Sequence, residues 1–152
     1  MLSDEEFDAR LAYEAKQMEE EEPSFHPVGG DLKKWTGFIL GTGIYESGVF
    51  EIEIIVPRSF PYDPPKVIWK TNIWHPNIFQ KNVCVNILGK DWLPSMSLTG
   101  VIETLRNLLN YPNPHSALNT QAAREMTQNF DQFVKTAKEY VQKYATWENL
   151  GK

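Results

Sequence analysis

The sequence predicts an α+β fold, in which an N-terminal helix precedes a four-stranded antiparallel meander sheet, and C-terminal helices follow a long loop. Three observations support this prediction. Apolar residues recur at helical spacing near the N-terminus, strand-like patterns fill the region up to residue 70, and helical spacing returns after residue 96. The sequence of 152 residues has no internal repeat and no linker-like change of composition. We therefore expect one domain over residues 1–152.

The first helix has a recognisable start and stop. Ser3 and Glu6 have the spacing of a capping box, in which each side chain binds a free amide of the first turn. An apolar stripe follows at helical spacing and consists of Phe7, Leu11, Ala15 and Met18. Pro23 ends the helix. The acidic run Glu19–Glu22 is interpreted as a solvated helix end, although its charge is unfavourable at the negative end of the helix dipole and suggests a partner or fraying.

Strands are predicted between this helix and residue 70. Glycine turns flank residues 35–40, and residues 49–56 alternate between apolar side chains and glutamates, as in a strand with one solvated face. A proline-rich connection leads to a further strand at residues 66–70. The connections are too short for helical crossovers, so neighbouring strands should run antiparallel. Residues 71–96 are expected to form a long irregular loop, which in a compact domain is usually functional.

Helices are predicted for the rest of the chain. Ser97 or Thr99 can cap an apolar helix that contains Leu98, Val101, Ile102, Leu105, Leu108 and Leu109. The prolines of residues 111–114 end this helix. A final amphipathic helix contains Phe130, Phe133, Val134, Ala137, Val141 and Tyr144.

The composition excludes several classes of protein. A net charge of -5 and a pI near 5.2 argue against nucleic acid as the main partner. No signal-peptide pattern and no apolar run of membrane-spanning length is present, so no membrane association is expected. The single cysteine favours a reducing compartment, and we expect a cytoplasmic monomer, with a nuclear location also open if the source is eukaryotic. The three histidines have no metal-ligand spacing, so no metal is expected.

The most informative residue is this lone cysteine, Cys84. A single thiol cannot form an internal disulfide, which leaves core packing, an incidental thiol or a nucleophile as its role. A lone cysteine is more often a small buried apolar residue. Here, however, it lies in the stretch of residues 74–88, within the long loop of residues 71–96, and a loop of that length is usually functional.

The residues around Cys84 give the chain a specific resemblance. Landmarks occur in order along nearly the whole chain: Gly48–Phe50, Pro57 with Phe60–Pro65, His75–Pro76–Asn77, Val83–Cys84 with Ile87–Leu88, Trp92–Pro94, Leu108–Leu109 with Pro112–Pro114, and Leu118–Asn119 with Ala122–Ala123. Each landmark is weak alone, but together they are similar to the ubiquitin-conjugating enzymes. Members of this family carry ubiquitin or a ubiquitin-like modifier as a cysteine thioester.

The resemblance implies roles for three residues of the loop. Cys84 would accept the modifier from an activating enzyme, which uses the ATP of the cascade, and would pass it to a lysine of a protein substrate or to a ligase. Asn77 would either stabilise the oxyanion or order the loop by hydrogen bonding, and both alternatives predict that Asn77→Ala impairs transfer to lysine. His75 is expected to be structural rather than a base.

The sequence also departs from the family pattern near the nucleophile. Asn86 and Ser116 stand where many relatives have an acidic residue, and Asp91 is the nearest remaining acid in the sequence. Activation of the incoming amine should then depend on desolvation or on a partner. A phosphate on Ser116 would restore negative charge. The segment from Asn77 to Cys84 is also one residue shorter than usual, and Asn82 replaces a common glycine, so a tight turn with positive φ is expected there.

The resemblance further places two partner surfaces. RING-type ligases are expected to dock on Tyr62 and Asp63 in one loop and on Pro94 and Ser95 in another. Tyr62 is the candidate anchor, although its ring could instead pack on the neighbouring prolines.

The first helix normally docks the activating enzyme with basic residues, and here Arg10 and Lys16 are the only candidates in an acidic helix. A more basic activating enzyme would complement this charge.

Two alternatives come from other classes of protein. The chain could be a non-catalytic scaffold of the same fold that binds the modifier, but such variants generally lack the cysteine that is present here. It could also be an adaptor whose proline-rich loops bind peptides, but residues 60–65 are better explained as a connection between strands.

Overall fold

The computed structural model describes all residues 1–152 and contains four helices, a four-stranded sheet and a small hairpin. The helices are α1 (Asp4–Glu21), α2 (Leu98–Asn110), α3 (Thr120–Gln128) and α4 (Phe130–Tyr144). The strands are β1 (His26–Val28), β2 (Asp31–Leu40), β3 (Val49–Ile55), β4 (Lys66–Trp69), β5 (Ile78–Phe79) and β6 (Asn82–Val83). The main sheet has the order β1-β2-β3-β4 with every pair antiparallel, which confirms the predicted α+β meander.

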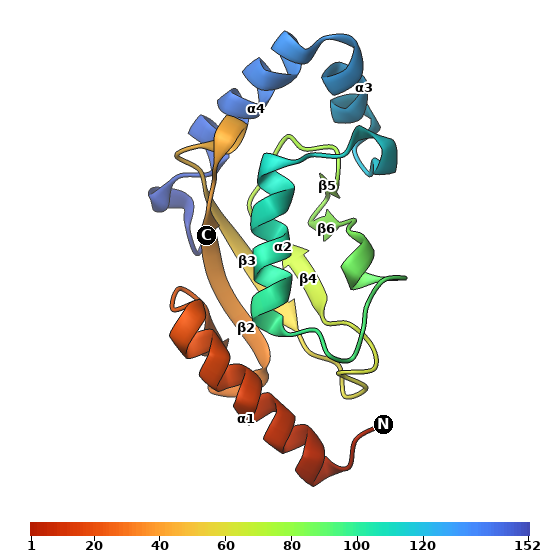
Figure 1. Ribbon diagram of the computed structural model, residues 1–152. Helices are drawn as coiled ribbons and strands as arrows, with labels where there is room; N and C mark the ends of the chain where they lie inside the picture. The colour runs from red at the N-terminus through yellow and green to blue at the C-terminus, as the bar shows by residue number, and fades with distance from the viewer.

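One helix covers a face of the sheet, and the other three lie at the two ends of the molecule. Helix α2 crosses one face of the sheet, α1 lies at one end of the molecule, and α3 and α4 lie at the other end (Figure 1). The N-terminal segment therefore lies far from the C-terminal helices, and the loop between β6 and α2 runs along the side between these two ends. No helix combines the length and the apolar character that crossing a membrane requires.

The two faces of the sheet differ as the alternation in β3 predicts. Ile52 and Ile54 are fully buried, whereas Glu53 faces the opposite side. There its carboxylate pairs with Lys34 of β2 and with Lys70 just beyond β4, at 3.7 and 3.8 Å. One side of the sheet therefore carries the core and the other carries charge.

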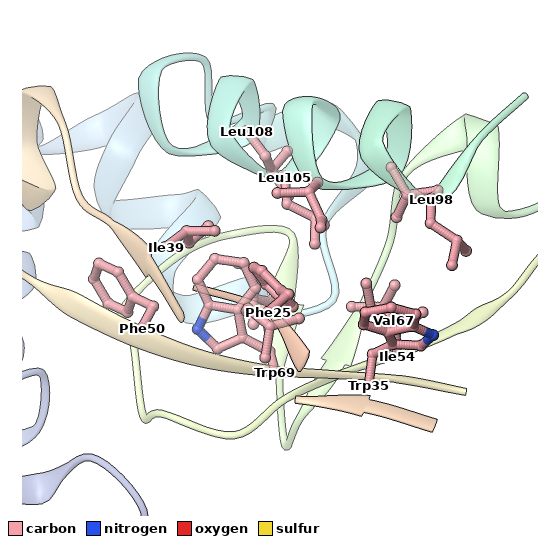
Figure 2. Packing of buried hydrophobic residues seen from close by; sticks show 14 of the residues in the cluster. Phe25, Trp35, Ile39, Phe50, Ile54, Val67, Trp69, Leu98, Leu105 and Leu108 are labelled. Carbon is pink, nitrogen blue, oxygen red and sulfur yellow. The ribbon is translucent and has the colours of Figure 1, made fainter. Parts of the chain in front are cut away.

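The core fills the space between this sheet and α2. Leu98, Leu105 and Leu108 point from α2 toward the sheet, where Trp69 and Ile54 meet them (Figure 2). These aliphatic and aromatic side chains are removed from water almost completely, and a buried leucine of this kind contributes about 2 kcal/mol. Because α2 is held this firmly, the loops at its two ends start from fixed positions.

The helix ends confirm most of the predicted caps. Ser3 and Glu6 form the capping box, with both hydrogen bonds present. Ser97, rather than Thr99, caps α2 by accepting a hydrogen bond from the amide of Gly100. Helix α1 ends at Glu21, just before Pro23.

The interpretation of the acidic run as a solvated helix end was wrong for its last residue. Glu22 is buried, and its carboxylate binds the guanidinium of Arg106 in α2 through two hydrogen bonds of 2.6 Å. The partner that the unfavourable charge suggested is thus found within the chain, 84 residues later. The side chains of Glu19–Glu21 remain exposed.

The long loop is more regular than the sequence predicts. Residues 71–96 include the β5–β6 hairpin and a short 3-10 turn at Asn86–Leu88. The two residues of the hairpin turn with positive φ are Gln80 at 50° and Lys81 at 70°. Asn82 lies in β6, so the expectation of a positive φ at that position was wrong. The tight turn itself exists, one residue earlier.

Candidate active site

Cys84 follows β6 directly, and its side chain is exposed to solvent. The short hairpin determines where it lies, because the carbonyl of Lys81 accepts a hydrogen bond from the amide of Trp69 and joins the hairpin to β4. The amide of Cys84 donates to the carbonyl of Asn77 at 2.9 Å. The thiol is thus presented at the surface from a backbone that is fixed on both sides.

Asn77 connects two segments that are distant in the sequence. Its side chain is 1% exposed and makes three hydrogen bonds to the loop after α2. Nδ2 donates to the carbonyls of Asn113 and Ser116 at 2.8 and 3.0 Å, and Oδ1 accepts from the amide of Asn113 at 2.8 Å. Both hydrogens of the amide group are therefore occupied by backbone carbonyls. This arrangement supports the loop-ordering role of Asn77 over direct donation to an oxyanion.

His75 is buried and lies directly behind this loop. Its Nδ1 accepts a hydrogen bond from the amide of Asn77, so its Nε2 carries the hydrogen and donates to the carbonyl of Leu108 at 2.9 Å. Burial lowers the pKa of His75 to about 4, although the hydrogen bond to Leu108 acts in the opposite direction. The neutral ring also stacks on Tyr45, whose hydroxyl donates to the carbonyl of Trp74. These contacts leave neither nitrogen free, as expected for a structural histidine.

The loop after α2 has a second anchor beside Asn77. The carbonyl of Pro76 accepts hydrogen bonds from the amides of Leu118 and Asn119, at 2.8 and 3.0 Å. Asn119 then caps α3 by accepting from the amide of Ala122. Residues 75–77 thus hold the loop at both of its ends, and the side chain of Ser116 remains exposed between the two anchors.

The residues after Cys84 form a short turn. Asn86 begins the 3-10 turn, and its carbonyl accepts a hydrogen bond from the amide of Asp91 at 2.9 Å. Both side chains are exposed, and the carboxylate of Asp91 takes part in no salt bridge. The structure therefore places Asp91 in the same surface turn as Asn86, on the segment that begins at the candidate nucleophile.

The two loops assigned to ligase binding lie side by side. The indole nitrogen of buried Trp92 donates to the carbonyl of Pro61 at 2.7 Å, which links residues 60–65 to residues 92–97. Tyr62 is 53% exposed, so its ring is not buried among the neighbouring prolines. Asp63, Pro94 and Ser95 are exposed as well. Trp92 was a landmark in the sequence, but its role as a link between the loops becomes visible only in the structure.

The two basic residues of α1 have different surroundings. Lys16 is exposed, as a contact with an activating enzyme requires. The guanidinium of Arg10 instead donates to the carbonyls of Pro94 and Met96, and it lies over the ring of Phe60. These internal contacts limit what Arg10 can offer to a partner at the surface of α1.

No group of three or more histidine, cysteine or acidic side chains is arranged to hold a metal ion. The reactive group that the site presents is the exposed thiol of Cys84. Buried Asn77 holds the loop of residues 113–116, and buried His75 joins the backbone of Asn77 to the end of α2.

Comparisons with known proteins agree with this geometry. The family model described as "Ubiquitin-conjugating enzyme" matches residues 7–141, so the chain belongs to the ubiquitin-conjugating enzyme family. It is therefore an enzyme of the transferase class.

Among curated proteins, the chain is 34% identical over 143 residues to "Ubiquitin conjugating enzyme E2 B" of Dictyostelium discoideum, covering 90% of this chain and 96% of that protein. It is also 41% identical over 97 residues to "Ubiquitin-conjugating enzyme E2 22" of Arabidopsis thaliana, covering 63% of this chain and 39% of that protein.

Solved structures show the same fold. The E2 domain of a Toxoplasma gondii ubiquitin conjugating enzyme superimposes with a TM-score of 0.84 at 34% identity, covering 91% of this chain and 99% of that one. A Plasmodium yoelii protein described as a ubiquitin conjugating enzyme gives a TM-score of 0.85 at 31% identity, covering 96% and 98%. The predicted family and fold are both confirmed.

Proposed function

We propose that Cys84 accepts ubiquitin or a ubiquitin-like modifier from an activating enzyme and passes it to an amine or a ligase. The observation that carries this proposal is the exposed thiol of Cys84, whose backbone is fixed by Asn77. A thiol is a good nucleophile in its thiolate form even when only a small fraction is ionised. The exposed position gives a large protein substrate access to it.

Loading is a transfer between two thiols. The Cys84 thiolate attacks the carbonyl carbon of the modifier's C-terminus on the activating enzyme and forms a new carbon–sulfur bond. The carbon–sulfur bond to the activating enzyme breaks, and the cysteine of that enzyme leaves as thiolate. One thioester replaces another, so this step needs no dedicated histidine base. The buried neutral His75 agrees with such a mechanism, because its two nitrogens are both occupied.

Discharge to lysine is the more demanding step. The amine nitrogen attacks the same carbonyl carbon, the carbon–nitrogen bond forms, and Cys84 leaves as thiolate while the amine gives up a proton. Asn77 binds the loop of residues 113–116 through its side chain and the amide of Cys84 through its carbonyl, which ties this loop to the segment of the nucleophile. We infer that Asn77 contributes by keeping this loop in place.

The surroundings of Cys84 carry little negative charge to accept that proton. Asn86 and Ser116 are uncharged, and Asp91 is exposed at the far end of the same turn. We therefore propose that the substrate or the ligase supplies much of the amine activation. Asp91→Asn should then slow discharge onto free lysine only about twofold, since a solvated carboxylate has a weak effect on a neighbouring pKa.

Partner recognition follows the surfaces described above. Tyr62 and Leu93 expose apolar surface on the two linked loops, which suits a RING-type ligase with an apolar groove. Helix α1 presents Lys16 among exposed acidic residues, so the matching activating enzyme should offer a basic face. No cofactor is needed on this chain, since the activating enzyme consumes the ATP.

The decisive experiment is a loading assay. The protein is incubated with ATP and with pairs of activating enzymes and modifiers, and products are separated with and without reductant. We expect an adduct that reductant removes and that Cys84→Ala does not form. Cys84→Ser should give an adduct that resists reductant, because an ester replaces the thioester.

The alternative is a non-catalytic scaffold that binds the modifier. It predicts binding of the free modifier by the wild type and by Cys84→Ala alike, with no covalent adduct for any activating enzyme. A reductant-sensitive adduct on the wild type rejects this alternative.

A further inference from the structure

Helix α1 holds the loop between Trp92 and α2 through two charged side chains, Arg10 and Glu14. Glu14 is 2% exposed, although a glutamate in a surface helix is ordinarily solvated. Its Oε1 accepts a hydrogen bond of 2.7 Å from the amide of Leu98, the first residue of α2. A buried carboxylate from one helix thus binds the N-terminus of another, where the helix dipole stabilises negative charge.

Arg10 lies one turn before Glu14 and binds the same loop closer to its exposed part. Its guanidinium donates to the carbonyl of Pro94 at 3.2 Å and to that of Met96 at 2.9 Å. It also lies 5.0 Å from the centre of the Phe60 ring and 3.5 Å from the carboxylate of Glu14. One arginine therefore contacts α1 and both of the loops that carry the ligase-binding candidates.

These contacts follow an alternating pattern along the loop. Trp92 is tied to Pro61, the carbonyls of Pro94 and Met96 are bound by Arg10, and the amide of Leu98 is bound by Glu14. The side chain of Leu93, between two of these anchors, is 56% exposed. The anchored positions thus hold the backbone still while an apolar side chain remains directed to solvent.

We propose that Arg10 and Glu14 are positioning residues that hold residues 92–97 in the conformation that a RING-type ligase recognises. This inference rests on the proposed function, because it assigns a role within ligase-assisted transfer. It also reassigns Arg10, which the sequence placed at the activating-enzyme surface. A loop that is already ordered loses less conformational entropy when a partner binds, so the pair should strengthen ligase binding without touching the ligase.

The substitution Glu14→Gln tests the pair with little change of shape. A glutamine can keep an oxygen toward Leu98, but its amide then directs N–H groups toward the guanidinium of Arg10. Arg10→Lys keeps the charge and removes the planar group that binds two carbonyls while stacking on Phe60. Both variants should loosen residues 93–98, which hydrogen exchange measures as faster exchange of the Leu98 amide.

Arg58 provides a matched control. Its guanidinium also binds α1, through the carbonyl of Leu2 and the carboxylate of Asp4, and it stacks on Phe7 at 4.6 Å. It makes none of the contacts to residues 92–98. Arg58 itself lies outside the helix, shortly after β3. Arg58→Lys therefore removes a second guanidinium that is bound to α1 while leaving the loop anchors intact.

The functional readout is the ratio of ligase-assisted to unassisted discharge, measured from preformed Cys84 thioester so that the loading rate does not enter. The ligase is a RING domain chosen from a panel because it accelerates discharge from the wild type. We expect this ratio to fall about tenfold in Glu14→Gln and in Arg10→Lys, as for loss of a charge-assisted hydrogen bond, and to be kept in Arg58→Lys. The Kd for the RING domain should rise by the same factor.

An unchanged ratio in Glu14→Gln, together with faster exchange of residues 93–98, would overturn the inference, as would equal losses in Arg58→Lys. A panel in which no RING domain accelerates the wild type would overturn it as well. Failure of the wild type to form any thioester is a separate result, which rejects the proposed function itself.

Discussion

The backbone carbonyl of Asn77 accepts a hydrogen bond from the amide of Cys84 at 2.9 Å, while the side chain of Asn77 binds the loop of residues 113–116. One buried residue therefore sets the relative position of the candidate nucleophile and of the loop opposite it. The two segments are brought together without any contact between charged groups.

Removal of the Asn77 side chain should disorder the opposite loop. Asn77→Ala leaves the amide of Asn113 and the carbonyl of Ser116 without a partner and removes the shorter hydrogen bond to the carbonyl of Asn113. We therefore expect about 2 kcal/mol lower stability and slower discharge onto lysine. Urea unfolding and single-turnover discharge measure the two effects, and hydrogen exchange should show faster exchange in residues 113–116. Asn107→Ala, at an exposed position of α2, is the control for stability. Discharge at the wild-type rate would contradict both roles considered for Asn77.

The buried His75 should make the protein sensitive to acid. Its pKa is about 4 in the folded state, below the ordinary value near 6.5, so the unfolded chain binds more protons between these values. The stabilising contribution is complete above pH 6.5 and is lost as pH falls toward 4, by about 3 kcal/mol in total. Urea unfolding at several pH values measures this slope, which His75→Gln should flatten. An equal slope in that variant would assign the acid sensitivity to other groups.

Replacement of one partner of the ion pair between Glu22 and Arg106 should lower the stability of the fold. Arg106→Met leaves the carboxylate of Glu22 buried without its partner, and because Arg106 itself is partly exposed we expect a loss of about 2 kcal/mol. Hydrogen bonding to Glu22 raises the pKa of Arg106, so the arginine stays charged at any usable pH. Glu103→Gln, which removes the exposed partner of the same arginine, should change stability by less than about 0.5 kcal/mol. Similar losses for both substitutions would contradict this ranking.

Substitutions in the hairpin turn before Cys84 should raise the stability of the protein. Gln80 and Lys81 both have positive φ, a conformation that asparagine and glycine adopt at lower cost. The double substitution Gln80→Asn/Lys81→Gly should therefore stabilise the protein by about 1 kcal/mol, or about 3 °C in Tm. Lys81→Val, which introduces a β-branched residue at the same φ, should lower Tm. A higher Tm for the valine variant would show that the turn conformation differs from the one described.

Local signals in the sequence predicted most of the fold. The Ser3–Glu6 capping box, the alternation in β3 and the Ser97 cap depend on residues close in the chain, and each was found as expected. The β5–β6 hairpin was missed because its turn, Gln80–Lys81, lacks the asparagine and glycine that usually mark such turns. Its conformation is imposed by tertiary contacts, such as the bond from Trp69 to the carbonyl of Lys81.

Contacts between residues that are far apart in the chain could not be predicted from the sequence alone. Glu14 and Glu22 are identical in type to the solvated glutamates beside them, and their partners Leu98 and Arg106 lie 84 residues away. For the same reason the sequence predicts that Arg10 is a surface charge, although its contacts are internal. At the candidate site, Cys84 and Asn77 were located by resemblance, but only coordinates could show that both amide hydrogens of Asn77 are occupied.

The exposed position of Cys84 has a consequence for the lifetime of the loaded enzyme. If Cys84 carries the modifier as we propose, small thiols in solution reach the thioester, and exchange with one of them would release the modifier without any substrate being modified. A partner that covers Cys84 during transfer would then protect the proposed thioester from this exchange. Transfer of the modifier to its acceptor would have to be faster than its exchange with small thiols.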